Sequence, residues 1–324
     1  MMRTLLNAVA VVGLVVLAGQ GQEKKDPPKT DTPKKDVPKK PAPKGLPPTV
    51  AAFKYGEHER QVLDFWQAKS DTPTPVVLMI HGGGWQNGDK AGYVGAAKAY
   101  LDVGISVAAI NYRYVKQAAA ANIEPPVKAP LEDAARALQT IRSKAKEWNI
   151  DKKRIGATGG SAGACTSLWL AFHEDMANPK SEDPIAREST RLYCAAVIGA
   201  QVSLDPKELR EWIPNYGYGA HAFNLKGFQE LFDKREQVIK WIKEYSPIEH
   251  LSKDDPPIFL QYSVKGAAPK VGTKQDDPTH SAVMGIKLQE RCKTVGVECL
   301  LVYPGVTDVK YKNVQEFLID RLRK

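Results

Sequence analysis

From residue 76 to the C-terminus, short apolar runs alternate with segments of helical periodicity. The runs have the length and apolar character of buried strands, and they cover residues 76–80, 105–110, 154–158, 195–198, 257–262 and 298–302. Apolar residues at helical spacing predict helices over residues 90–101, 130–141, 164–172, 281–294 and 314–322. This alternation predicts an α/β fold, a mostly parallel sheet with helices on both faces.

Residues 203–250 interrupt this alternation with aromatic residues at irregular spacing. The segment lies between two predicted strands, so we expect an insertion that is partly helical and lies over the active site. One interpretation is a lid or a pocket for an acyl or sugar group. The alternative is that its aromatic side chains only pack the insertion onto the core.

Two glycine-containing turns follow predicted strands. His81-Gly82-Gly83-Gly84-Trp85 comes after the strand at 76–80, and Gly159-Gly160-Ser161-Ala162-Gly163 comes after the strand at 154–158. Because ligands bind beyond the carboxyl ends of parallel strands, both turns are expected to face one site.

The second turn has the pattern of a serine nucleophile between a strand and a helix. Flanking glycines allow a bend sharp enough to expose Ser161, and the amide of Ala162 then opens a helix. Gly83 and Gly84 offer two more amides without side chains, so these three N–H groups predict an oxyanion hole. His81 precedes the donors and is interpreted as a structural residue of its turn.

These residues resemble a known family. The two turns, Gly88-Asp89-Lys90, Asn111-Tyr112-Arg113 and Glu132-Asp133 are similar to α/β-hydrolase esterases related to hormone-sensitive lipase, close to bacterial feruloyl and acetylxylan esterases (BD-FAE-like). The resemblance covers roughly residues 50–324. It implies an α/β-hydrolase fold, a Ser–His–Asp carboxylesterase mechanism and no metal or organic cofactor. It also implies a small-molecule or carbohydrate ester as substrate.

The chain departs from that family at the catalytic histidine. The resemblance implies the acid after the strand that corresponds to residues 257–262 here, and the histidine after the last strand. Here Tyr303-Pro304-Gly305 is followed by Asp308, and no histidine occurs after His280. We therefore hypothesise exchanged roles, with His280 as the base and Asp308 as the orienting acid, since a triad is defined by contact and not by chain order. Asp277 and Asp205 are alternative acids.

This departure keeps other interpretations open. His280 could instead be a capping or packing residue at the start of the helix at 281. The chain would then be a catalytically degenerate α/β-hydrolase that acts as a binding protein. A peptidase on the same fold is a third reading, with Glu208, Glu211 or Glu230 binding a substrate amine.

The N-terminus has the composition of an export signal. A short positive start, an apolar run and small residues predict a signal peptide over residues 1–21, with an uncleaved membrane anchor as the alternative. Residues 22–49 are rich in Lys and Pro and predict a disordered linker before a domain at 50–324. We therefore expect an exported protein, periplasmic or extracellular, with no stable membrane span after cleavage.

Net charge and cysteine spacing bear on possible partners and on disulfide bonding. Eight lysines and four acidic residues give residues 23–49 a net charge of +4 and Arg3 adds one, so residues 50–324 carry only +4 of the formal +9. This predicts no nucleic-acid partner, although the linker could hold the domain near an anionic envelope. Four cysteines fit no zinc pattern, and a Cys292–Cys299 disulfide or free thiols are both compatible with the sequence.

Overall fold

The computed structural model describes residues 45–263, 268–307 and 309–324. Every described residue belongs to one compact unit within Ala42–Lys324. The predicted signal peptide, nearly all of the predicted linker and Asp308 therefore lie outside the described residues. Within the described part, no helix combines the length and the apolar character needed to cross a membrane.

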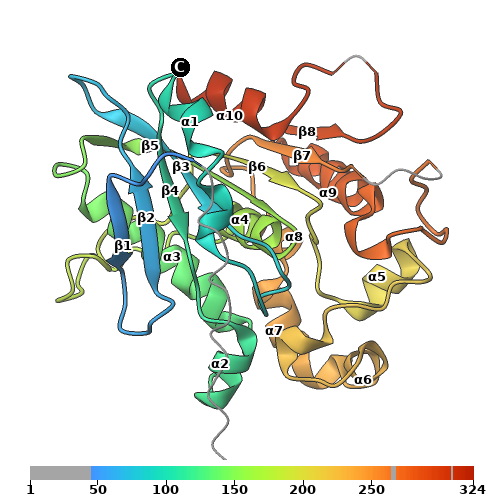
Figure 1. Cartoon of the computed structure of the whole chain (residues 1–324). Helices are drawn as coiled ribbons and strands as arrows, with labels where there is room; N and C mark the ends of the chain where they lie inside the picture. Colours follow the sequence, from blue (N-terminus) through green and yellow to red (C-terminus); the bar gives the residue numbers. More distant parts are fainter. Residues whose placement is uncertain (1–44, 264–267, 308) are drawn as a thin grey trace, which may run out of the picture. The chain divides into compact units, whose positions relative to one another are not determined.

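Eight strands form one sheet with the order β1-β2-β4-β3-β5-β6-β7-β8 (Figure 1). The six strands from β4 to β8 in that order run parallel, and β1 and β2 pair antiparallel at the edge. The bounds are β1 Val50–Lys54, β2 Val62–Trp66, β3 Thr74–Ile80, β4 Ser106–Ile110, β5 Ile150–Gly160, β6 Cys194–Ile198, β7 Ile258–Gln261 and β8 Cys299–Val302. The predicted mostly parallel α/β sheet is confirmed.

Helices cover both faces of the sheet. The side chains of β3 alternate between two cores, one on each face. Val76, Leu78 and Ile80 join a core with α3 (Lys128–Ser143), α4 (Ala162–Phe172) and α9 (Ala282–Val295). Val77 and Met79 point the other way, into a core with α1 (Ala97–Leu101) and α10 (Val314–Leu322). Because side chains alternate across a strand, a continuous apolar run such as β3 is buried on both sides.

The insertion carries five short helical segments. They are α5 (Pro206–Trp212), η2 (Ala220–Phe223), α6 (Phe228–Asp233), α7 (Arg235–Tyr245) and α8 (Pro247–His250). Its aromatic residues Tyr216, Phe223 and Phe228 are buried in the same core as α4. For these three side chains, packing onto the core explains the aromatic composition.

Some local predictions need correction. The helix expected over residues 90–101 is divided into η1 (Lys90–Tyr93) and α1, because Gly95 between them and Gly92 within η1 disfavour a continuous helix. The helix α2 (Val115–Ala120) was not predicted, since its six residues are too few to show a periodicity. All four cysteines are free thiols.

Candidate active site

Ser161 lies in a strained turn between β5 and α4. Its backbone has φ 52° and ψ −119°, a conformation that non-glycine residues rarely adopt, and its amide donates to Ile198 O at 2.9 Å. A Cβ on Gly163 would lie 2.0 Å from Ile80 O, and one on Gly159 would lie 2.5 Å from the same oxygen. The two glycines are therefore required because the turn packs directly against the end of β3.

His280 and Ser161 meet, although 119 positions separate them in the sequence. His280 ends the short helix η3 (Pro278–His280), and its Nε2 lies 3.0 Å from Ser161 Oγ. Nδ1 of the same ring lies 2.8 Å from Asp277 Oδ2. A carboxylate can only accept, so Nδ1 carries the proton and Nε2 keeps a lone pair for the serine hydroxyl. This is the arrangement of a nucleophile, a base and an orienting acid.

Asp277 has two roles in this turn. While Oδ2 accepts from the imidazole, Oδ1 caps η3 by accepting from the amides of Thr279 and His280 at 3.1 and 3.2 Å. The same carboxylate therefore fixes both the backbone and the ring of His280. Asp277 and His280 are only three residues apart.

The other proposed acids differ from Asp277. Asp308, the acid of the exchanged-role hypothesis, lies outside the described residues. Asp205 is placed elsewhere: it caps α5 by accepting from Lys207 N at 2.9 Å, and it forms an ion pair with Arg235 at 2.5 Å. Its carboxylate is thus engaged within the insertion, which excludes Asp205 as the partner of His280 in this structure.

The glycine loop after β3 lies beside the nucleophile. A Cβ on Gly82 would lie 3.6 Å from the Cβ of Ser161. Gly83 has φ 97° and Gly84 has φ 60°, and a Cβ on Gly83 would meet Asn87 O at 2.3 Å. In the described part of the chain, neither Gly83 N–H nor Gly84 N–H donates a backbone hydrogen bond outside helices and strands. Ala162 is the first residue of α4, so its amide has no intrahelical acceptor.

His81 supports this loop instead of acting on substrate. Burial lowers its pKa to about 4, with the Arg60 guanidinium adding to the effect and the Gly82 carbonyl opposing it. The neutral ring donates from Nδ1 to Gly82 O at 2.8 Å and accepts at Nε2 from Arg60 at 3.3 Å. It also stacks on Tyr112 at 4.2 Å between ring centroids. The imidazole is thus enclosed on both edges and one face.

The remaining motif residues of the resemblance continue this support. Lys90 pairs with Asp64 at 2.6 Å, and its amide donates to Asn111 Oδ1 at 2.7 Å. Arg113 pairs with the buried Asp133 at 2.6 Å. Arg60, which the sequence did not single out, joins the loop by donating to Tyr112 O at 2.8 Å and Gly88 O at 3.2 Å. Of these residues, Arg60 also contacts the glycine loop directly, through His81 Nε2 at 3.3 Å.

A pocket of about 530 Å³ opens over Ser161. Its lining residues are Gly82, Tyr93, Gly160, Ser161, Ile198, Gly199, Ser263, Asp277 and His280. Gly199 has φ 60°, and a Cβ there would lie 3.3 Å from His280 Cδ2, so this glycine gives the imidazole its space. Ile198 is 39% exposed, which leaves an apolar surface beside the nucleophile.

Gln201 supports the turn at residues 277–280, which carries His280. Its side chain is buried, and Nε2 donates to Thr279 O at 2.8 Å and to Gly199 O at 3.2 Å. It thus connects the turn that carries His280 to the segment after β6. Sequence reasoning missed Gln201, because a single glutamine after a strand has no distinguishing pattern.

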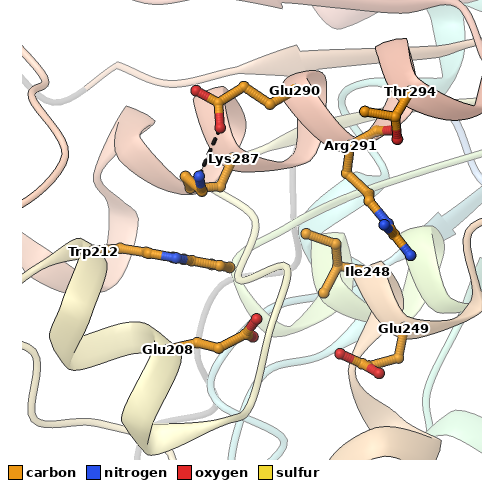
Figure 2. A pocket seen from close by; sticks show the side chains of 8 residues that line it. All are labelled: Glu208, Trp212, Ile248, Glu249, Lys287, Glu290, Arg291 and Thr294. Atoms are coloured by element: carbon orange, nitrogen blue, oxygen red, sulfur yellow. Dashed lines mark hydrogen bonds and ion pairs between the residues drawn. The ribbon is translucent and has the colours of Figure 1, made fainter.

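A second cavity of about 490 Å³ lies between α5, α8 and α9 (Figure 2). It is lined by Glu208, Trp212, Ile248, Glu249, Lys287, Glu290, Arg291 and Thr294. Lys287 pairs with Glu290 at 2.6 Å, and Glu208 accepts from Ser203 Oγ at 2.8 Å. This cavity shares no lining residue with the Ser161 pocket, and Glu230 pairs with Lys234. The carboxylates considered for a peptidase therefore do not line the pocket of the nucleophile.

The other described histidines form no hydrogen bond with Ser161. His58 accepts from Arg60 N in the turn between β1 and β2. The ring of His221 lies 4.8 Å from that of Tyr218 and 6.3 Å from that of Trp85. His173 and His250 are neighbours beyond the other end of α4. Among the described histidines, only His280 forms a hydrogen bond with Ser161.

Comparison with known proteins identifies the family. The BD-FAE family model matches residues 63–276, about two thirds of the chain. The chain belongs to the BD-FAE family. The match includes the glycine loop, the nucleophile turn and the insertion, and it ends one residue before Asp277. The resemblance drawn from the motifs is thereby confirmed.

Relatives and solved structures agree with membership of the BD-FAE family. The chain is 27% identical over 221 residues to a probable carboxylic ester hydrolase, LipM, of Mycobacterium tuberculosis, covering 64% of this chain and 45% of that protein. It is 28% identical over 231 residues to gut esterase 1 of Caenorhabditis elegans, covering 67% and 41%. The chain thus spans less than half the length of these relatives.

A solved structure described as a truncated form of a carbohydrate esterase from gut microbiota has the same fold. It superposes with a TM-score of 0.64 at 19% identity and covers 85% of this chain and 96% of its own. This superposition confirms the expected α/β-hydrolase fold for the BD-FAE member described here.

Proposed function

We propose that this protein is a serine carboxylesterase that hydrolyses acyl esters through an acyl-enzyme at Ser161. The observation that carries the proposal is the 3.0 Å contact between His280 Nε2 and Ser161 Oγ, with Asp277 at 2.8 Å from the other ring nitrogen. Membership of the BD-FAE family and similarity to named ester hydrolases support it.

In the first half-reaction Ser161 Oγ attacks the acyl carbon while its proton passes to His280 Nε2. Asp277 holds the ring and stabilises the imidazolium that forms. When the tetrahedral intermediate collapses, the bond between the acyl carbon and the alcohol oxygen breaks, and His280 returns the proton to the departing alcohol. In the second half-reaction His280 takes a proton from water, whose oxygen attacks the acyl carbon of the acyl-enzyme. The bond between the acyl carbon and Ser161 Oγ then breaks, His280 returns the proton to Oγ, and the acid is released.

Negative charge on the acyl oxygen needs donors placed before the reaction begins. The amides of Gly83, Gly84 and Ala162 are proposed to supply them. Positive φ angles at the two glycines and the open first turn of α4 support this assignment. The dipole of α4 adds favourable potential at the same point. Such donors typically contribute ~2.7–4 kcal/mol each to stabilisation of the transition state.

The proposed substrates are esters of small acids with carbohydrate or other small alcohols. The open pocket beside Ser161, with the apolar Ile198 on one side, suits a short acyl group. Export through the predicted signal peptide would place the enzyme where acylated polysaccharides occur. The solved structure with the same fold is described as a carbohydrate esterase, which agrees with this substrate class.

Hydrolysis of 4-nitrophenyl acetate and of acetylated xylo-oligosaccharides by the purified protein tests the proposal. We expect turnover by the wild type and its loss in Ser161→Ala, with unchanged folding by circular dichroism. Turnover that persists in Ser161→Ala would contradict the mechanism. A wild type that binds acetylated oligosaccharides without hydrolysing any ester would favour the binding-protein alternative.

A further inference from the structure

Three potential metal ligands converge at the end of α4 that is remote from Ser161. His173 follows the last residue of α4, Glu244 lies on α7, and His250 ends α8. One ligand atom from each side chain lies within 4.8 Å of the other two. Within residues 45–263, 268–307 and 309–324, this is the one group of three His, Cys, Asp or Glu side chains whose ligand atoms lie this close together.

The protons of the two imidazoles are assigned by their neighbours. His173 Nδ1 lies 2.9 Å from Glu174 O, and His250 Nε2 lies 2.6 Å from Glu244 O. A carbonyl oxygen only accepts, so each of these nitrogens carries a hydrogen and donates it. The opposite nitrogens, Nε2 of His173 and Nδ1 of His250, then hold the lone pairs. Metal-bound histidines are typically oriented in this way, with the other N–H given to a carbonyl.

In this tautomer the contact between His173 Nε2 and the Glu244 carboxylate favours a proton or a cation between the two atoms. His173 Nε2 lies 3.1 Å from Glu244 Oε1, so a lone pair and a carboxylate face each other unless a proton or a cation stands between them. The second imidazole is also close, with ring centroids of His173 and His250 4.7 Å apart. Two neutral rings at that distance can share one cation.

We propose that His173, Glu244 and His250 bind a zinc-type divalent transition-metal ion. Two imidazoles and a carboxylate are a common ligand set for Zn²⁺, and Mg²⁺ or Ca²⁺ would require oxygen ligands instead. Bond lengths of ~2.0–2.2 Å in a tetrahedral site put ligand atoms about 3.3 Å apart. The 3.1 Å pair is already at that spacing, and all three ligand atoms lie within 4.8 Å of one another, so a small movement of the third ligand would complete the site.

The proposed ion would link the insertion to α4, the helix that follows β5. α4 begins at the nucleophile and has eleven residues, so the site lies roughly 17 Å from Ser161 along the helix axis. Its three ligands join α4 to α7 and α8 of the insertion. We therefore assign it a structural role that is independent of the proposed esterase reaction.

Isothermal titration of the EDTA-treated, full-length protein with ZnCl₂ tests the site. The titration uses a His280→Ala background, so that the active-site imidazole cannot bind the metal. We expect one Zn²⁺ per chain and no comparable heat with MgCl₂. At free Zn²⁺ near 100 times the dissociation constant, the thermal midpoint should rise by about 5 °C.

Variants locate the binding. His173→Gln/His250→Gln keeps side chains of similar size but should lose both the zinc heat and the zinc-dependent rise in midpoint. The exposed Glu244→Gln should fold normally and weaken zinc binding at least tenfold. His58→Gln, on the loop between β1 and β2, should change neither. Absence of zinc binding in the background protein, or zinc binding retained in the double variant, would overturn the proposal.

Discussion

The two halves of the candidate active site are built differently. The glycine loop at residues 81–85 is enclosed by buried side chains, with His81 stacked on Tyr112 and hydrogen-bonded to Arg60. The turn at residues 277–280 is half exposed: the side chains of His280 and Asp277 are 36% and 41% accessible. The loop presents backbone amides from a rigid support, whereas the turn presents two side chains that mainly hold each other. Substitutions should therefore act on chemistry at the turn, and on geometry and stability at the loop.

The largest expected effect is at the base. His280→Ala removes the only described imidazole that contacts Ser161, so kcat for 4-nitrophenyl acetate should fall on the order of 10⁶-fold. His58→Ala is the matched control, since the side-chain hydrogen bond of His58 stays within the turn between β1 and β2. A His280→Ala enzyme within tenfold of wild type would mean that another group takes the Ser161 proton.

Substituting each candidate acid in turn shows whether Asp277, Asp205 or Asp308 orients His280. Asp277→Asn should lower kcat by roughly 10³–10⁴-fold, because the amide cannot hold the imidazole in the required tautomer. Asp205→Asn should leave kcat within a few-fold, since Asp205 pairs with Arg235. The decisive comparison is Asp308→Asn. If that variant loses more activity than Asp277→Asn, the exchanged-role hypothesis from the sequence is correct and the acid is Asp308.

A substitution in the glycine loop can disturb its geometry and leave the side chains of Ser161, Asp277 and His280 unchanged. Gly83→Ala places a Cβ against Asn87 O in a backbone with φ 97°, so the loop must move and kcat should fall about 10²–10³-fold. Gly92→Ala is the control, because a Cβ at Gly92 meets nothing within 4 Å. Unchanged kcat with intact folding in Gly83→Ala would show that this amide does not stabilise the transition state.

A smaller effect is expected from the support beneath the turn. Gln201→Ala removes the hydrogen bonds to Thr279 O and Gly199 O, so His280 should be less well positioned and kcat should fall about tenfold with little change in KM. Gln289→Ala, which loses a bond to Cys299 O instead, should retain full activity. Equal losses in both variants would indicate general destabilisation instead of positioning.

His81, which supports the loop without facing the pocket, should affect stability more than rate. The folded pKa of His81 is about 4, below the ordinary value of 6.5, so its neutral form stabilises the fold fully above pH 6.5. That contribution, about 3 kcal/mol, is lost as the pH falls from 6.5 towards 4. The free energy of unfolding, measured with urea, should fall less steeply over this range in His81→Gln. Equal slopes would show that His81 does not titrate in this way.

The same contrast explains what the sequence could predict. Glycine at 82–84, 159 and 163 is required by backbone contacts, so the motif itself reports the turn, the nucleophile and the expected donors. His280 could be inferred only because the family position holds no histidine. Its acid partner could not be singled out: Asp277 works through a three-residue turn whose geometry appears only when the chain folds. Arg60, Gly199 and Gln201 act through contacts with distant segments, which no local pattern records.

Covalent labelling tests the central contact most directly, because a fluorophosphonate reports the nucleophile without assuming a substrate. Peptide mass spectrometry of the wild type should find the phosphonyl group on Ser161, and labelling should become far slower in His280→Ala while His58→Ala reacts like wild type. An unlabelled Ser161, or equal labelling rates in His280→Ala and wild type, would contradict activation of Ser161 by His280.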